Sequence, residues 1–145
     1  MPLDLRPLAN EDLAPLLVFW ANTPGVGLNE SDTPECLQVF LKRNPLLSMV
    51  AMDGEQIAGA VLCGHDGRRG YLHHLAIAPR YRRQGLARRM VESCLQSLRE
   101  QGVLKCNIFL YADNLSGAEF WNRCGWSRRA DLVMMQHRCP TSSPD

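Results

Sequence analysis

The chain has 145 residues, which fits one domain with a single core, since domains typically run to about 100 to 150 residues. Sixteen Lys and Arg against fifteen Asp and Glu leave a net charge of +1, which excludes a protein that coats polyanions through many phosphate contacts. No apolar run approaches the roughly 20 residues of a membrane span, and no basic start precedes an apolar segment. We therefore expect a soluble, cytoplasmic protein with no nucleic-acid or membrane partner.

The first part of the chain predicts a short strand over 3–6 and two helices. Asn10 is the expected N-cap of a helix that carries Leu13, Leu16, Leu17 and Trp20. After a loop over 22–27, Thr33 and Pro34 provide a cap and a first-turn proline, which predicts a second helix over about 34–43.

Two Asp-Gly pairs predict hairpins in the next part of the chain. The apolar runs 46–52 and 56–63 are joined by Asp53-Gly54, a turn in which both positions tolerate positive φ. A second pair, Asp66-Gly67, leads into the strand that contains Tyr71. We expect three consecutive antiparallel strands.

The stretch from Leu72 to Gly102 passes from a strand, through a turn, into one long amphipathic helix. Pro79 ends the strand. Apolar residues then recur at three- and four-residue steps from Leu86 to Leu98, so one side of the helix faces a core. In the turn between them, small residues stand where the amides of a helix N-terminus can approach an anion, and the expected anion is a phosphate or pyrophosphate.

The remaining chain predicts a strand over 105–111 and a short helix capped by Asn114 or Ser116 and ended by Gly125. The segment 126–137 is expected to be a closing strand or hairpin, and the polar tail 140–145 to be frayed. This order of elements favours an α/β sandwich built on a mixed sheet. The six cysteines contain no CxxC pair, which suits a reducing compartment.

Two motifs in this frame resemble the GNAT N-acetyltransferase superfamily. The turn Arg82-x-x-Gly85-x-Ala87 is similar to the family's acetyl-CoA signature, and the segment from Asn114 to Trp126 is similar to its Asn-x-x-x-Ala-x-x-Tyr-x-x-x-Gly-Phe pattern. The resemblance covers about 46–126. It implies one domain over 1–139 with a three-layer α/β/α sandwich, a largely antiparallel mixed sheet and helices on both faces.

The resemblance also implies an enzyme that moves the acetyl group of acetyl-CoA to an amine by direct attack in a ternary complex. The acceptor would be a small-molecule or peptide amine, and the protein a monomer or homodimer. Backbone groups of the central strand would hold the thioester arm, the turn would hold the pyrophosphate, and Asn114 would hold the pantetheine. The implied cofactor-binding residues are Leu75, Ala76, Ile77, Arg82, Arg83, Gln84, Gly85, Leu86, Ala87, Asn114, Ala118 and Trp121.

Three residues are candidates for proton transfer. His73 and His74 are adjacent, so strand alternation sends them to opposite faces unless a bulge intervenes, and one of them is expected to face the cleft. The glutamate that some family members carry on the next strand is absent from 107–110. Trp121 occupies the position of the family's acidic tyrosine and has no proton to give at neutral pH, which leaves Tyr111 as the nearest alternative.

Other interpretations stay open at this stage. The histidines can be packed strand residues, Asn114 a plain N-cap, and Trp121 and Trp126 core aromatics. One of Arg80, Arg88 and Arg89 can reach the 3′-phosphate of coenzyme A or simply face solvent, and Arg68 with Arg69 can bind an anionic acceptor group or only form a hairpin. Cys63, His65 and the two histidines lack a recognised zinc spacing, and we expect no metal. The chain can also be a non-catalytic acyl-CoA-binding or sensing module, or a basic-loop interaction protein.

Overall fold

The computed structural model describes residues 3–141. By its internal contacts the chain divides into two compact units, one that ends at Tyr111 and one that begins at Ala112.

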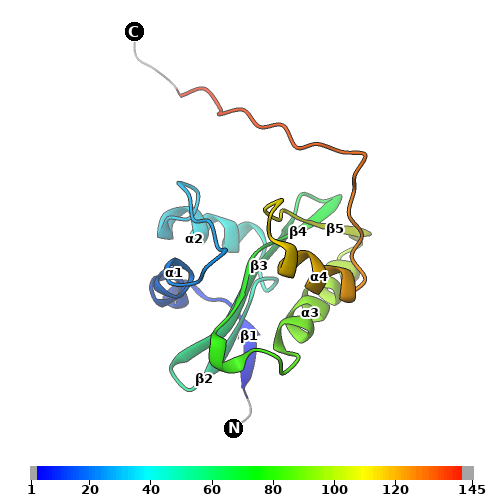
Figure 1. Cartoon of the computed structure of the whole chain (residues 1–145). Helices are drawn as coiled ribbons and strands as arrows, with labels where there is room; N and C mark the ends of the chain where they lie inside the picture. The colour runs from blue at the N-terminus through cyan, green and yellow to red at the C-terminus, as the bar shows by residue number, and fades with distance from the viewer. Residues whose placement is uncertain (1–2, 142–145) are drawn as a thin grey trace. The chain divides into compact units, whose positions relative to one another are not determined.

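The first unit is built on one five-stranded sheet (Figure 1). Its strands follow one another across the sheet in chain order, and all neighbours are antiparallel except the last pair, which is parallel. The strands are β1 (Asp4–Pro7), β2 (Met49–Asp53), β3 (Gln56–His65), β4 (Arg69–Ile77) and β5 (Lys105–Ile108). The expected α/β fold with a mixed, largely antiparallel sheet is confirmed.

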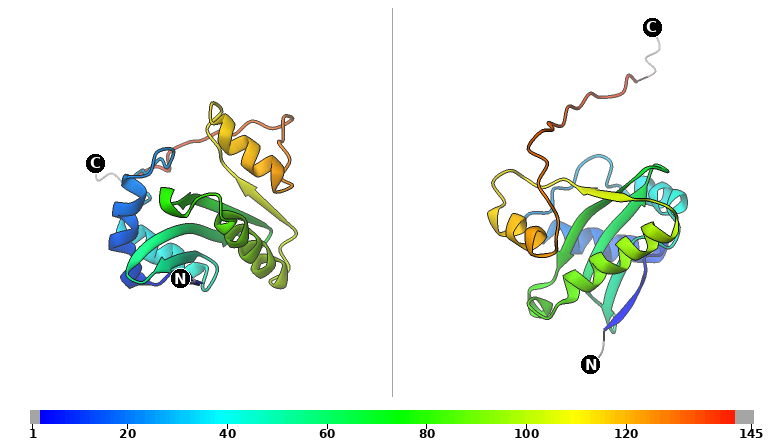
Figure 2. Two further views of the ribbon diagram at one scale, coloured as in Figure 1. Left: turned by 60° about the horizontal axis from the view of Figure 1, so that its bottom comes forward. Right: turned by 90° about the vertical axis from the view of Figure 1, so that its right-hand side faces the viewer.

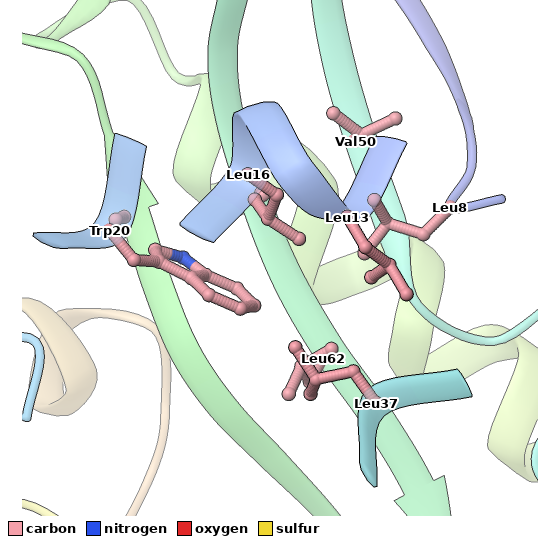
Figure 3. Packing of buried hydrophobic residues seen from close by; sticks show 9 residues of the cluster. Leu8, Leu13, Leu16, Trp20, Leu37, Val50 and Leu62 are labelled. Atoms are coloured by element: carbon pink, nitrogen blue, oxygen red, sulfur yellow. The ribbon is translucent and has the colours of Figure 1, made fainter. Parts of the chain in front are cut away.

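Helices cover both faces of this sheet (Figure 2). One face carries α1 (Leu13–Ala21) and α2 (Pro34–Arg43), and the other carries α3 (Leu86–Glu100). The core beneath α1 and α2 is apolar, and Figure 3 shows its main side chains converging from the two helices, the sheet and the segment after β1: Leu8, Leu13, Leu16, Trp20, Leu37, Val50 and Leu62. The predicted apolar stripe of α3 is buried at Leu86, Met90, Val91, Cys94 and Leu98. Across residues 3–141, the helices are too short or too polar to cross a bilayer.

The structure confirms the start predicted for α2 but not the one predicted for α1. Thr33 caps α2 through its hydroxyl oxygen, which accepts from the Cys36 amide at 3.2 Å. Before α1, residues Asn10–Asp12 form a 3₁₀ turn instead of starting the helix at an Asn10 cap. The carboxylate of Asp12 accepts from the Ala9 amide at 2.8 Å and also binds Arg6, so a charged side chain within the 3₁₀ turn fixes the entry to the helix.

The first hairpin turn lies one residue later than expected. Asp53 pairs with Gln56, so the two turn residues are Gly54 and Glu55, and of the two only Gly54 has positive φ. The Tyr81 hydroxyl donates to the carboxylate of Asp53. This contact joins the hairpin to the 3₁₀ turn Pro79–Tyr81 that follows β4.

The second unit contains α4 (Leu115–Arg123), which begins at the predicted cap. The Asn114 carboxamide oxygen accepts from the Gly117 amide at 2.9 Å. The closing strand or hairpin predicted over 126–137 is wrong, because the structure has no strand in this segment of the described chain. Arg129 and Asp131 form a local ion pair, and the following apolar run from Leu132 to Met135 is exposed. Apolar residues favour a strand only where a neighbour supplies hydrogen bonds. Of the expected frayed tail, residues 142–145 lie outside the described chain.

Candidate active site

A bulge in β4 places both candidate histidines on one face of the sheet. Leu62 of β3 pairs with His73 and Ala60 pairs with Ala76, so a single β3 residue lies opposite His74 and Leu75. His74 takes up the extra residue with a φ of 55°. The expectation that the two side chains point to opposite faces is therefore wrong, because a bulge interrupts the period-two alternation on which it rested.

His73 lies within a row of aromatic rings. Its ring stacks at 6.2 Å on Tyr71 and at 6.2 Å on Phe109, and it meets the edge of Phe40 from α2 at 6.3 Å. Burial lowers the pKa of His73, and the charge of the adjacent His74 lowers it further, whereas Asp32 acts in the opposite direction. His73 is thus held toward its neutral form.

His74 pairs with a carboxylate from the loop before α2. Its Nε2 lies 3.0 Å from Oδ1 of Asp32, and the exposed fractions of the two side chains are 17% and 7%. The His74 ring also meets the ring of Trp20 at 5.0 Å. Sequence reasoning missed Asp32, because it lies 42 residues from His74 within a polar loop and no motif spacing links the two.

The edge of β4 that faces β5 is free along the second half of the strand. Within residues 3–141, β4 pairs with β5 only from Arg69 to Leu72. Leu75, Ala76 and Ile77 follow that last pair, and on the other side Ala76 and Ile77 pair with β3. The residues expected to hold a thioester arm through their backbone therefore lie on a part of the strand edge that β5 does not pair with.

The turn before α3 combines two residues with positive φ. Arg83 has a φ of 62° and Gly85 a φ of 79°, and α3 begins immediately afterwards at Leu86. Such an alternation aims successive backbone amides into one concavity, and the helix N-terminus adds its own partial positive charge. Apart from its chain neighbours, no atom lies within 4 Å of the position that a Gly85 Cβ would take, so the space beside Gly85 is open.

The side chains of the turn support its shape. Arg82 donates through Nε to the Ile77 carbonyl oxygen, and the Gln84 amide donates to the Arg80 carbonyl oxygen at 3.3 Å. Leu86 is buried, so it offers the site only its backbone, and Ala87 is half-buried.

Arg80 and Arg88, two of the basic residues around the turn, have local partners. The guanidinium of Arg80 lies 5.5 Å from the centre of the Tyr81 ring, and Arg88 forms an exposed ion pair with Glu92 at 3.4 Å. No group of His, Cys, Asp and Glu side chains that could hold a metal ion occurs in the described part of the chain.

Tyr111, the last residue of the first unit, is exposed and lies against the loop after α1. A Cβ built on Gly27 of that loop would overlap the Tyr111 hydroxyl. The loop between α1 and α2 therefore contacts two of the three candidate catalytic side chains, through Gly27 at Tyr111 and through Asp32 at His74.

The other predicted cofactor residues belong to the second unit. Asn114 caps α4, Ala118 is half-buried, and Trp121 is buried between the edges of two rings, Phe120 at 5.2 Å and Trp126 at 4.8 Å. Their roles as a helix cap and as core aromatics are thus observed. Their part in binding a cofactor stays a prediction.

The first unit is thus an α/β sandwich with a turn of two positive-φ residues at the start of its longest helix. Residues 15–126 match the model of the acetyltransferase (GNAT) family. The chain therefore belongs to the acetyltransferase (GNAT) family and is an N-acetyltransferase, which confirms the resemblance.

Relatives and solved structures agree with this assignment. The chain is 30% identical over 106 residues to N-alpha-acetyltransferase 30 of Schizosaccharomyces pombe, and this match covers 70% of this chain and 71% of that protein. Its fold is similar to that of AAC(6')-Iy in complex with a bisubstrate analog, with a TM-score of 0.75, 14% identity and coverage of 96% and 100% of the two chains. It is also similar to a chain of the NatC complex bound to Gag peptide and CoA, with a TM-score of 0.72, 21% identity and coverage of 89% and 87%.

Proposed function

We propose that this chain transfers the acetyl group of acetyl-CoA to an acceptor amine by direct attack, with both substrates bound at once. The observation that carries the proposal is the turn from Arg82 to Ala87. Its two positive φ values and open amides suit a pyrophosphate, because backbone amides at a helix N-terminus bind anions without a bulky side chain between.

The free edge of β4 supports the position of the reacting group. Strand backbone at Leu75, Ala76 and Ile77 can pair with an extended amide-bearing arm, as a peptide pairs with an exposed sheet edge. An arm that runs from the turn along this edge leads toward His74, at the bulge of the same strand.

The chemistry requires two proton movements. The acceptor nitrogen uses its lone pair to form a bond to the acetyl carbon, the carbon–sulfur bond breaks, and the thiolate of coenzyme A leaves. The nitrogen loses a proton, for which His74 is the base, since an imidazole is suited to proton transfer near neutral pH. The thiolate gains a proton, for which the Tyr111 hydroxyl is the available donor among our candidates, because the Trp121 indole has no acidic proton.

The acceptor is a small-molecule or peptide amine. The relative from Schizosaccharomyces pombe is named an N-alpha-acetyltransferase and the NatC complex was solved with a peptide, whereas the AAC(6')-Iy structure holds an acetylneamine analog. Incubation of the protein with acetyl-CoA and a panel of peptides, polyamines, amino acids and aminoglycosides tests the proposal, with release of free thiol as the measurement. Acetyl-CoA binding without thiol release on any amine would contradict it.

That contradicting result defines the second candidate function, a non-catalytic acyl-CoA-binding module. It is favoured by the residue at position 121. Trp121 stands where the GNAT family often has an acidic tyrosine, and its ring is packed as a core aromatic. Calorimetric binding of acetyl-CoA and of coenzyme A, measured beside the thiol assay, separates the two functions.

A further inference from the structure

We propose that Asp32 is a positioning residue that fixes the His74 ring with its proton on Nε2, so that Nδ1 is the atom that takes the proton of the acceptor amine. This assignment rests on the proposed function. It adds a residue that no sequence motif indicates, and it names the reacting nitrogen of His74.

The tautomer follows from what surrounds the carboxylate. Oδ2 of Asp32 accepts from the Asn29 amide at 3.0 Å, and Oδ1 lies 3.0 Å from Nε2 of His74. An ionised carboxylate can only accept, so the proton of this contact belongs to His74 Nε2. A neutral imidazole has one N–H, and its lone pair is therefore on Nδ1.

The carboxylate is held in place before any substrate arrives. The Asp32 amide donates to the Asn29 carbonyl oxygen at 3.0 Å while the Asn29 amide donates to the Asp32 side chain, so the loop is closed in both directions. Thr33 then caps α2, which fixes the chain on the other side of Asp32. Pre-organisation of this kind removes the cost of orienting the base at the moment of reaction.

The imidazole is held from its other sides as well. His74 occupies the left-handed region within a bulge whose two ends are fixed by the pairs of His73 with Leu62 and of Ala76 with Ala60. Trp20 of α1 is fully buried and meets the His74 ring at an interplanar angle of 64°. The titratable groups that interact with His74 include Asp32 from the loop and His73 from its own strand, and α1 places the indole of Trp20 against the ring.

When the acceptor amine forms its bond to the acetyl carbon, its N–H proton passes to Nδ1 of His74. The ring then carries a positive charge, which the Asp32 carboxylate stabilises through Nε2–H without taking the proton itself. The same division of roles between a histidine and a buried carboxylate is well known in serine hydrolases. The proton leaves His74 when the product dissociates, so Asp32 and His74 return to their starting state.

Asp32→Asn is the sharpest variant for this assignment. An asparagine has one oxygen, and the Asn29 amide requires that oxygen as its acceptor. The NH₂ group is then turned toward His74 Nε2, where it donates and forces the ring proton onto Nδ1. We expect kcat near neutral pH to fall by about 100-fold or more, which is the usual range for a lost general base, with the Kd for acetyl-CoA unchanged. The deficit should shrink at alkaline pH, because hydroxide can then take the N–H proton that His74 no longer accepts.

Nitrogen NMR of the protein labelled at histidine provides a readout that does not depend on activity. At mildly alkaline pH the signals of His74, assigned by their loss in His74→Gln, should show an Nε2–H tautomer in the wild type and an Nδ1–H tautomer in Asp32→Asn. Asp66→Asn is the matched control, since this exposed carboxylate serves the amides of Arg68 and Arg69 at 2.8 Å and should leave kcat and tautomer unchanged.

Each outcome decides a separate question. An Nδ1–H tautomer of His74 in the wild type would overturn the role of Asp32, as would wild-type kcat in Asp32→Asn at every pH. A wild-type protein that has the Nε2–H tautomer but releases no thiol with any amine would overturn the proposed function and the catalytic use of Nδ1, while the positioning of His74 by Asp32 would stand.

Discussion

The Nε atom of Arg82 donates a 2.9 Å hydrogen bond to the carbonyl oxygen of Ile77, the last residue of β4. This contact fixes the turn before α3 to the end of the strand that carries the bulged histidine. From the sequence, we expected Arg82 or Arg83 to contribute charge to a phosphate. The structure assigns Arg82 a second task, which is to hold the shape of the turn.

Arg82→Gln should therefore weaken acetyl-CoA binding by roughly three- to tenfold, in line with the loss of one charge-assisted hydrogen bond of about 1 kcal/mol at an exposed site. Titration calorimetry measures the change. Arg99→Gln in the last turn of α3 removes an equally exposed charge far along the helix and should leave the affinity unchanged. Equal affinities of the two variants would exclude a role for the Ile77 contact.

Gly85 and Gly54 form a matched pair for testing the anion site. Both have positive φ, at 79° and 61°, and neither has an atom within 4 Å of the place for a Cβ. Replacing either by Glu should thus cost a similar free energy of unfolding, about 1 to 2 kcal/mol for a left-handed residue with a side chain. Only Gly85→Glu puts a carboxylate over the amides of the turn, so only this variant should lose the rise in melting temperature that acetyl-CoA causes. A preserved shift in Gly85→Glu would show that the pyrophosphate binds elsewhere.

Acid should destabilise the fold through His73. Burial lowers the pKa of His73 in the folded state, whereas in the unfolded chain it returns to about 6.5, so below that pH the unfolded state binds the extra proton. The free energy of unfolding contributed by neutral His73 is therefore fully present above about pH 6.5 and falls as the pH drops below it. Denaturant unfolding from pH 7.5 to 5.5 should give a flatter profile in His73→Gln, while the exposed His137 changed to Gln should leave the profile as in the wild type. Parallel profiles for His73→Gln and the wild type would contradict this assignment.

The contact between Gly27 and Tyr111 should appear as a coupling energy. Gly27→Ala introduces a methyl group that overlaps the tyrosine hydroxyl, and Tyr111→Phe removes that hydroxyl. A double-mutant cycle on thermal or denaturant stability should give a coupling of about 0.5 kcal/mol or more, with the double variant more stable than the two single changes predict. The same cycle with Tyr71→Phe in place of Tyr111→Phe serves as the control and should be additive. Additive behaviour of Gly27 and Tyr111 would mean that the loop and the tyrosine do not share this space in solution.

Local signals in the sequence predicted the parts of the fold that depend on local chemistry. Thr33 and Pro34 defined the start of α2, and the spacing from Leu86 to Leu98 gave the buried side of α3, because caps and helical periodicity act within a few residues. Local signals could not predict the bulge at His74, because it arises from the way β4 pairs with β3, a separate segment of the chain. The His74 contact with Asp32 depends in turn on that bulge, so the pair became visible only in three dimensions.

The closing strand predicted over 126–137 was wrong because local composition was taken as sufficient for a strand. The run from Leu132 to Met135 has the composition of a strand, but a strand is completed by the hydrogen-bonding groups of its neighbour, and composition does not supply them. The structure observed there instead is a turn over 129–132 that contains the local ion pair of Arg129 with Asp131.

Trp121 provides the last test, because it stands where the resembling family often has an acidic tyrosine. Its ring is 8% exposed and meets Phe120 and Trp126 at interplanar angles of 78° and 67°. Trp121→Tyr should destabilise this packing by about 1 to 2 kcal/mol, since a smaller ring buries less apolar surface and loses part of the edge contacts. We expect weaker acetyl-CoA binding and a kcat at saturation no higher than in the wild type.

Trp121→Phe is the matched control, since it removes the indole without adding a hydroxyl. Equal kcat in the two variants would fit a packing role, whereas a kcat in Trp121→Tyr above both the wild type and Trp121→Phe would show that protonation of the thiolate limits this enzyme.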